Sequence, residues 1–251
     1  MVRILLSNDD GITSPGLRAL HEAVRPLGKV TVVAPDREQS AAGHSLNLHR
    51  PLRVDLLEEG WYAVDGTPTD CINLALNGLF KDERPDIILS GINRGANLGD
   101  DITYSGTVAA AMEATLLGVR AAAFSIVYEP GRPMLYDLAA EFACKMASEM
   151  LRRRLMPGVL LNVNVPNVPR EECSGVRVTR QGKRIYGDAI VEKIDPRGRA
   201  YYWIGGSGLK WVEEPDTDFD AIAHRAISVT PVRLDMTDHD TLRELEKWNL
   251  Q

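Results

Sequence analysis

The stretch that decides the fold is VRILLSNDDG, residues 2–11. Residues 2–6 form a short apolar run, which predicts a buried β-strand. Asp9 and Asp10 follow it as adjacent carboxylates that repel each other, and a bound Mg²⁺ or Mn²⁺ would remove that repulsion. Ligands of open α/β sheets bind at the carboxyl ends of strands, so the stretch predicts a metal site there. An ordinary Asn/Asp/Gly turn is the structural alternative.

Outward from this strand, strand-like apolar runs alternate with amphipathic helical patterns. Ser14-Pro15 has the residues of an N-cap followed by proline at the first helical position. The alternation predicts an α/β fold with a doubly wound, mostly parallel sheet. The expected strands are residues 2–6, 30–34, 86–89, 121–126 and 159–163, and the expected helices are residues 16–27, 67–79, 107–117 and 135–151.

Two segments depart from this alternation. Residues 44–64 alternate and are broken by glycine, which predicts an antiparallel excursion. After Pro166 we expect strands at 176–180, 185–194, 200–204 and 226–232, with short helices near 220–224 and 240–248. Tyr201-Tyr202-Trp203 is the densest aromatic run in the chain and fits either core packing or a buried interface equally well.

Composition narrows the class of protein. The chain has 251 residues, 44% hydrophobic and 25% charged, which favours one large globular domain spanning residues 1–251. The net charge of −6 argues against a polynucleotide partner. The longest apolar stretch, residues 108–127, contains Glu113, Gly118 and Arg120, so we expect no membrane span. Three widely spaced cysteines favour reduced thiols and a cytoplasmic location.

Loops after the second and third expected strands offer further polar ligands. Ser40 has a neutral oxygen suited to a metal, and His44 is a candidate acid, although a lone loop serine or histidine is a weak signal. Asn93 and Asn97 carry amide oxygens for a hard cation and amide NH₂ groups for phosphate oxygens. Glycines at 91, 95 and 99 free the backbone to approach a ligand. No GxGxxG or GxxxxGK[ST] occurs, so dinucleotide and Walker-type triphosphate binding are not supported.

A helix is expected to begin after YSGT, residues 104–107. The N–H groups and dipole of such a helix start favour an anion, and the small side chains of Ser105, Gly106 and Thr107 let a phosphate approach. A plain serine cap on an alanine-rich core helix is the alternative. One oxygen-ligated cation beside one helix N-terminus suits phosphoester hydrolysis.

These motifs, in this order, closely resemble the SurE (survival protein E) family over nearly the whole chain. The segments that carry the resemblance are NDDG (8–11), APDR (34–37) with Ser40, GTPTDC (66–71), SGIN (90–93), NLG (97–99), YSGT (104–107), NVNVP (162–166), TRQ (179–181) and SVTP (228–231). The family comprises divalent-metal-dependent nucleoside monophosphate phosphatases. They have a Rossmann-like core and form dimers or tetramers by exchanging a C-terminal segment.

The resemblance implies roles for particular residues. One divalent cation per subunit, Mg²⁺ or Mn²⁺, would be held by Asp9, Asp10, Ser40 and Asn93, with Asp9 or Asp10 also a candidate base. Asn97, Ser105, Gly106 and Thr107 would contact phosphate. The substrates would be 5′- and 3′-nucleotides, with exopolyphosphatase activity as a further possibility. A β-hairpin arm at about residues 181–210 would mediate a homodimer or homotetramer.

Three alternatives stay open on the residues alone. A nucleotide sensor would bind nucleoside monophosphate and metal without releasing phosphate. An enzyme for polyphosphate or a sugar phosphate would use the same machinery on another ester. A purely structural oligomer would bind no metal, and the carboxylate pair argues against it.

Overall fold

The computed structural model describes residues 1–153, 155–185, 190–204 and 210–250. Its strands are β1 (Arg3–Ser7), β2 (Lys29–Pro35), β3 (Val54–Glu58), β4 (Trp61–Val64), β5 (Ile87–Arg94), β6 (Arg120–Ile126), β7 (Val159–Val165), β8 (Val176–Val178), β9 (Arg184–Ile185), β10 (Ile190–Ile194), β11 (Ala200–Ile204), β12 (Lys210–Trp211) and β13 (Ile227–Arg233). Nine of them form one sheet in the order β3-β4-β2-β1-β5-β6-β7-β13-β8.

The six strands from β4 to β7 in this order are mutually parallel, which confirms the predicted sheet. β3 and β13 run antiparallel to their neighbours β4 and β7. The predicted antiparallel excursion at residues 44–64 is therefore the β3–β4 hairpin, but β4 also joins the main sheet parallel to β2.

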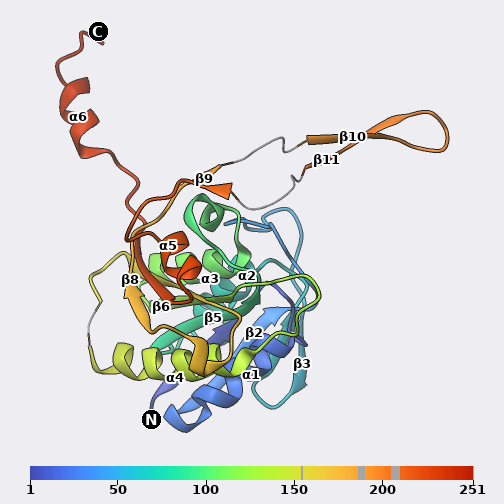
Figure 1. Cartoon of the computed structure of the whole chain (residues 1–251). Coiled ribbons are helices and arrows are strands. Elements are labelled where there is room, and N and C mark those ends of the chain that lie inside the picture. The colour runs from blue at the N-terminus through green and yellow to red at the C-terminus, as the bar shows by residue number, and fades with distance from the viewer. Residues whose placement is uncertain (154, 186–189, 205–209, 251) are drawn as a thin grey trace.

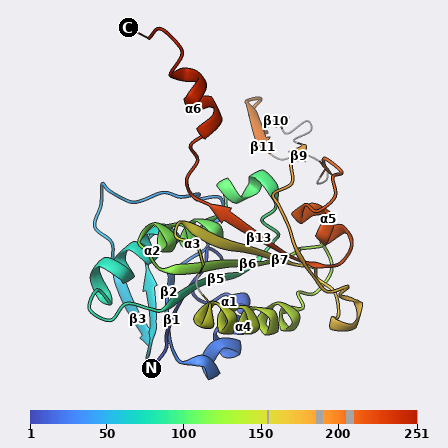
Figure 2. The ribbon, with the colours of Figure 1, turned by 90° about the vertical axis from the view of Figure 1, so that its left-hand side faces the viewer.

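Helices cover both faces of the sheet, as the doubly wound pattern requires (Figure 2). The helices are α1 (Pro15–Val24), α2 (Pro68–Leu74), α3 (Gly106–Leu116), α4 (Tyr136–Arg152), α5 (Asp218–Ala223) and α6 (His239–Leu245). α1 and α4 lie on one face and α2 and α3 on the other. Ser14, Thr67 and Ser105 cap α1, α2 and α3 through their side-chain oxygens, and Pro15 confirms the predicted first-turn proline.

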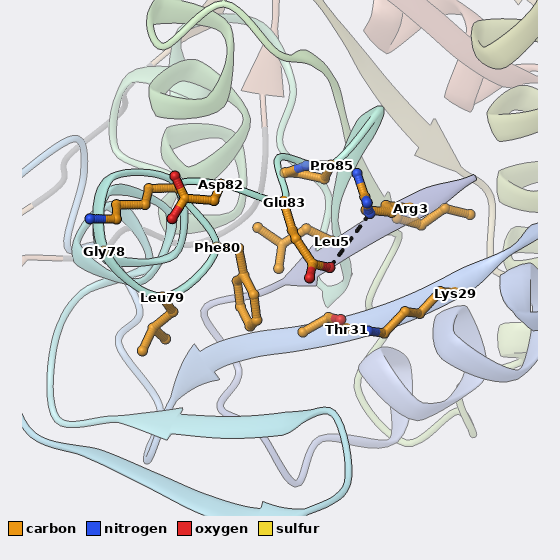
Figure 3. Close-up of a pocket in the computed structure, with 12 residues that line it drawn as sticks. Arg3, Leu5, Lys29, Thr31, Gly78, Leu79, Phe80, Asp82, Glu83 and Pro85 are labelled. Atoms are coloured by element: carbon orange, nitrogen blue, oxygen red, sulfur yellow. Dashed lines mark ion pairs between the residues drawn. The ribbon is translucent and has the colours of Figure 1, made fainter. Parts of the chain in front are cut away.

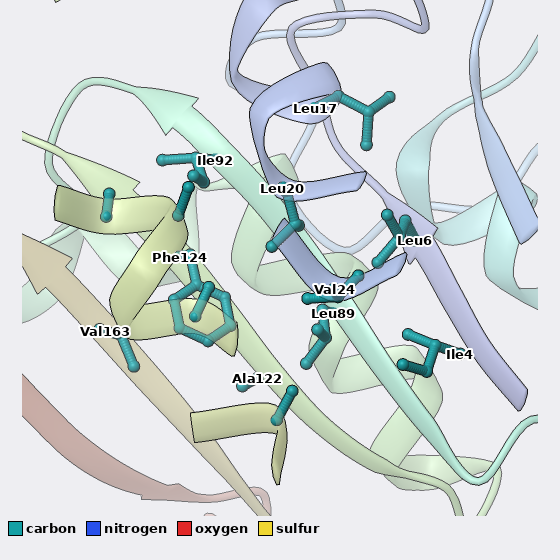
Figure 4. Close-up of a cluster of buried hydrophobic side chains, with 14 of the residues drawn as sticks. Ile4, Leu6, Leu17, Leu20, Val24, Leu89, Ile92, Ala122, Phe124 and Val163 are labelled. Carbon is teal, nitrogen blue, oxygen red and sulfur yellow. The ribbon is translucent and has the colours of Figure 1, made fainter. Parts of the chain in front are cut away.

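Two apolar layers hold these helices to the sheet. In the layer under α1 and α4, Leu6 and Phe124 from the strands meet Leu17 and Leu20 from α1 (Figure 4). The opposite layer joins small residues of α3, such as Ala110 and Ala114, to β5 and β6. All six of these side chains are buried. This core fixes the strand ends at which the candidate site lies.

Three predicted boundaries were wrong. β5 continues to Arg94, past the predicted end at residue 89, because residues 93 and 94 still pair with β6 after an irregularity. The strand expected at 176–180 ends at Val178. Of the strand expected at 185–194, Ile185 and residues 190–194 belong to β9 and β10, and residues 186–189 lie outside the described part.

β10 and β11 pair as an antiparallel hairpin that extends away from the sheet (Figure 1). Tyr202 and Trp203 on β11 are 60% and 64% exposed, so packing of this run in the chain's own core, one of the two expectations, is wrong. α6 also stands apart from the sheet, with no buried residue. No helix in the described part is long and apolar enough to cross a membrane.

Candidate active site

The N-terminus of α3 packs directly on Asp9. The Thr107 hydroxyl donates a hydrogen bond to Asp9 Oδ1. A Cβ added to Gly106 would lie 2.7 Å from Asp9 Cβ and 3.0 Å from Asp9 Oδ2, so only glycine allows this approach. The structure therefore brings the first carboxylate of the pair to the helix N-terminus that the sequence offered as a phosphate site.

Asp10 contacts the neighbouring strand. The Arg94 N–H donates to Asp10 Oδ2 at 2.9 Å, which places Asn93, one residue earlier on β5, beside this carboxylate. The Asn93 Nδ2 donates to the Gly95 carbonyl at 2.7 Å. The Asn93 Oδ1, which is the acceptor atom of the amide, has no protein partner among the described residues.

The loop after β2 is tied to the loop after β1. The Gln39 N–H donates to the Asp9 carbonyl at 2.8 Å, and Ile12 N–H donates to the Pro35 carbonyl at 2.8 Å. Ser40, next to Gln39, is thereby placed at the same strand ends, where its hydroxyl donates to Glu38 Oε1 at 2.6 Å. Gly11 allows the two loops to approach this closely, because its φ is +90° and a Cβ there would lie only 3.0 Å from the Arg37 backbone.

Asn97 is buried and held from three sides. Its N–H donates to Asn164 Oδ1 and its Nδ2 to Ser125 Oγ, both at 2.8 Å, and its carbonyl accepts from Asn162 and Asn164 at 2.9 Å. Ser105 caps α3 through a 3.1 Å hydrogen bond from Val108 N–H. The structure thus holds Asn97 and Ser105, two of the four predicted phosphate contacts, in fixed positions.

His44 is the one candidate that lies apart. Its Nε2 is 2.8 Å from Oε2 of Glu113, a buried residue seven positions along α3 from Gly106. At 1.5 Å per residue that is roughly 10 Å from the helix start. Asn73 Nδ2 donates to the other Glu113 oxygen at 2.7 Å. Among the described contacts, none joins His44 to Asp9 or Asp10.

Burial sets the charge state of the carboxylates. It raises the pKa of Asp9 from 3.8 to about 6, with the Thr107 hydrogen bond opposing and the Asp10 charge adding to the shift. Burial also raises the pKa of Asp10, where the Arg94 N–H bond opposes it and the Glu38 charge adds to it. Both shifts express the cost of holding a negative charge in a partly dehydrated position.

The donor set fits a hard divalent cation. Two carboxylates, one hydroxyl and one amide oxygen lie on three adjacent strand ends, and all are oxygen ligands of the kind that Mg²⁺ and Mn²⁺ accept. Within the described ranges, no cluster of three or more His, Cys, Asp or Glu residues could hold a metal ion. A metal here would therefore need neutral ligands such as Ser40 and Asn93 beside the carboxylates.

Several supporting residues were not predicted. The Asp218 carboxylate is completely buried and accepts from Gly99 N–H at 2.7 Å and Gly182 N–H at 2.8 Å. It thereby joins the loop after Asn97 to the root of the arm. Asn162 and Asn164 interrupt an apolar strand, LLNVNV, and buried polar residues in such a run are a detectable signal. Asp218 gave no comparable local signal.

The structure also has a cavity of about 450 Å³ that contains none of the predicted site residues (Figure 3). It lies at the opposite, amino-terminal edge of the sheet, where Arg3 and Lys29 begin β1 and β2. Arg3 and Glu83 form a 3.7 Å ion pair in it. The candidate site is instead at the carboxyl edge, as expected for a parallel sheet.

The fold and the site together define an α/β protein with a cluster of oxygen-bearing side chains against a helix N-terminus. The model of the family "Survival protein SurE" matches residues 4–188, and the chain belongs to this family. It is 55% identical over 249 residues to the "5'-nucleotidase SurE" of Geobacter sulfurreducens, covering 99% of this chain and 94% of that protein. The protein of the same name from Myxococcus xanthus also gives 55% identity, with the same coverage.

A solved structure agrees with this assignment. The crystal structure of the SurE protein from Aquifex aeolicus is 42% identical and has a TM-score of 0.88. The match covers 97% of this chain and 98% of that one. The Rossmann-like sheet predicted from the alternating pattern is therefore confirmed both by the strand order and by a solved relative.

Proposed function

We propose that this protein is a divalent-metal-dependent phosphatase that hydrolyses nucleoside monophosphates to nucleoside and phosphate, as a 5′-nucleotidase. The observation that carries the proposal is the contact of Asp9 with Gly106 and Thr107, because a helix start favours an anion and a carboxylate favours a cation. The relatives named 5'-nucleotidase SurE support the same activity. 3′-Nucleotides and polyphosphate are further substrates of the same site.

In this proposal Asp9, Asp10, Ser40 and Asn93 hold one Mg²⁺ or Mn²⁺. Bound there, the cation would polarise the phosphoryl group and promote ionisation of the attacking water. Asp9 is kept in position by Thr107, and Asp10 by the Arg94 N–H. The chain thus fixes both carboxylates before substrate arrives.

The remaining phosphate oxygens meet the start of α3. The N–H groups of Gly106 and Thr107 lie in the first turn, which leaves them without partners inside the helix. Together with the side chains of Asn97 and Ser105, they would stabilise the charge that develops in the transition state. Asp9 or Asp10 is the candidate base. His44 remains the proposed acid, to be tested by His44→Asn on the turnover of a poor leaving group.

We also propose that the protein forms a homodimer or homotetramer through the arm at about residues 181–210. Tyr202, Trp203 and Ile204 of β11 are exposed by 60%, 64% and 89%, and aromatic residues gathered on a surface favour an interface.

We further propose a cytoplasmic location. The three cysteines of the protein are free in this structure, which is consistent with a reducing cytoplasm.

The test is phosphate release from a panel of 5′- and 3′-nucleotides, ribose 5-phosphate and polyphosphate, with Mg²⁺ or Mn²⁺ and with chelator. Asp9→Asn serves as the site control. Metal-dependent release that is lost in the variant supports the proposal. Metal binding by folded protein with no release from any ester contradicts it and favours a nucleotide sensor.

A further inference from the structure

Two exposed planar side chains stack beside Asp10. The Arg94 guanidinium lies 4.3 Å from the centre of the Tyr128 ring, a cation–π distance. Tyr128 is 41% exposed and Arg94 is also exposed. Among the described residues, no carboxylate forms an ion pair with Arg94. The guanidinium is therefore a flat cation held in place by a ring and open to solvent.

The backbone fixes both partners of this stack relative to the candidate metal site. The Arg94 N–H is hydrogen-bonded to Asp10 Oδ2 at 2.9 Å, so the stack begins one side-chain length from that carboxylate. The Gly95 N–H donates to the Ile126 carbonyl at 2.9 Å, and the Val127 N–H donates to the Val165 carbonyl at 3.0 Å. Arg94 and Tyr128 therefore stand on two anchored strand ends, and little conformational freedom is lost when a ligand binds.

We propose that the Arg94–Tyr128 stack, a stacking platform, is the subsite that binds the nucleobase of the substrate. The inference rests on the proposed nucleotidase function and deepens it. Guanidinium planes and tyrosine rings stack on nucleobases, and this contact tolerates different bases because every base has a π face. With the phosphate held at the start of α3 and by the cation that Asp9 and Asp10 would bind, a base swung toward β6 would meet this pair. The site would then prefer nucleotides over other phosphate esters without reading one particular base.

A second exposed tyrosine provides the rival position. Tyr104 is 62% exposed and precedes Ser105 at the start of α3. Its ring has no stacked cation among the described contacts, and its carbonyl accepts from Gly43 N–H at 3.2 Å. The two tyrosines lie on different elements, so separate substitutions distinguish them.

The experiment compares adenosine 5′-monophosphate with ribose 5-phosphate, which has the same phosphate ester and no base. Steady-state phosphate release with Mn²⁺ is measured for the wild type and for Tyr128→Ala, Tyr128→Phe, Arg94→Lys and Tyr104→Ala. Arg94→Lys keeps the positive charge near Asp10 but removes the planar guanidinium, whereas Tyr128→Phe keeps the aromatic ring. We expect Tyr128→Ala and Arg94→Lys to raise the KM for the nucleotide roughly tenfold. The kinetic constants for ribose 5-phosphate should change less than about twofold, because they do not depend on stacking.

Three outcomes overturn the inference. They are equal losses on both esters, no change on the nucleotide, and a selective loss in Tyr104→Ala instead of Tyr128→Ala. If the wild type releases no phosphate from either ester, the proposed function has failed by itself. The stack is then judged by equilibrium binding of adenosine 5′-monophosphate with Mn²⁺, where Tyr128→Ala must weaken binding by the same factor.

Discussion

At the carboxyl ends of β1 and β5 many polar side chains are buried, whereas the β10–β11 hairpin leaves apolar side chains in solvent. Asp9 is 5% exposed and is held by Thr107. Trp203 is 64% exposed, and in the described part of the chain its strand pairs with β10 alone. Among the described residues, the first region holds three buried polar atoms without a hydrogen-bond partner, Ser7 Oγ, Asn8 Oδ1 and Ser90 Oγ. The second lacks a surface to pack on.

The two regions would be stabilised in different ways. The buried carboxylates, whose pKa values are raised, would keep their negative charge most easily beside a cation, because desolvation disfavours the charged form. Exposed aromatic and branched side chains need an apolar surface, because burying them removes their contact with water. The predictions below separate these two needs.

The largest effect is expected at the proposed metal site. Asp10→Ala removes one of the two carboxylates proposed as ligands and leaves the Arg94 N–H without its acceptor. We expect kcat/KM for nucleoside monophosphates to fall by a factor on the order of 10³ or more. Phosphate release at saturating Mn²⁺ measures this, and titration calorimetry should show weaker metal binding. Full activity of the variant in the presence of chelator would contradict the metal site.

A second contrast concerns apolar packing in the two regions. Phe124 is fully buried between β6 and the helices α1 and α4, so Phe124→Ala should lower the free energy of unfolding by about 3–5 kcal/mol. Ile194→Ala in the hairpin removes a side chain that is 70% exposed and should change it by less than about 0.5 kcal/mol. Urea unfolding at low protein concentration compares the two variants. Equal losses would mean that the hairpin packs on its own chain.

Much of the core was predictable because local pattern and global fold agree. Residues 2–6 predicted β1, and Ser14-Pro15 predicted the start of α1, because apolar runs and caps are local signals. Ligands of a parallel sheet bind at the carboxyl ends of its strands, and this alone predicted that Asp9 and the helix start at Thr107 lie close together. Ser40 was only a weak local candidate, and the family resemblance supplied its role as a proposed ligand.

What the sequence hid has physical reasons. Residues 90–94 read as a loop because Gly91 and Asn93 are typical of turns. The chain instead continues along β6, so closely that a Cβ on Gly91 would lie 2.3 Å from the Phe124 carbonyl oxygen. Asp218 is 119 residues from its partner Gly99, and no local pattern encodes such a contact. The exposure of Trp203 follows from the way the β10–β11 hairpin extends away from the sheet, which no local pattern in residues 200–204 encodes.

A third prediction uses pH to test whether a cation stabilises the ionised Asp9 carboxylate. Because the pKa of Asp9 is raised to about 6, the folded metal-free chain keeps a proton that the unfolded chain releases near 3.8. Its free energy of unfolding should therefore fall between these pH values by up to about 3 kcal/mol. Asp9→Asn does not titrate, so in chelator its stability relative to the wild type should rise by that amount from about pH 4 to 7.

Urea unfolding of both proteins at several pH values, with chelator and with Mn²⁺, makes this measurement. Saturating Mn²⁺ should cancel the gain, because the cation stabilises the ionised wild-type site. A constant difference between variant and wild type across the pH range would mean that burial does not hold Asp9 protonated.

A smaller effect is expected where the two regions meet. Asp218→Asn replaces one of the two oxygens that accept from Gly99 and Gly182 with an NH₂ group, which cannot accept. We expect a loss of about 1–3 kcal/mol in stability, the cost of buried donors without acceptors. Because Gly99 follows Asn97, kcat should fall while metal affinity stays unchanged. Calorimetric metal titration beside kinetics tests this, and an equal drop in metal affinity would show that the damage reaches Asp9.

The smallest effect on the site should come from the hairpin. Trp203→Ala removes the largest exposed ring of β11, far along the chain from every candidate ligand. We expect kcat with nucleoside monophosphates to stay within about twofold of the wild type, because no described contact joins this ring to the site. Association, measured by sedimentation, should weaken. If turnover instead collapses as in Asp10→Ala, the hairpin of one subunit completes the site of another, and the separation between the two regions fails. If neither turnover nor association changes, the proposed role of the hairpin in assembly is wrong.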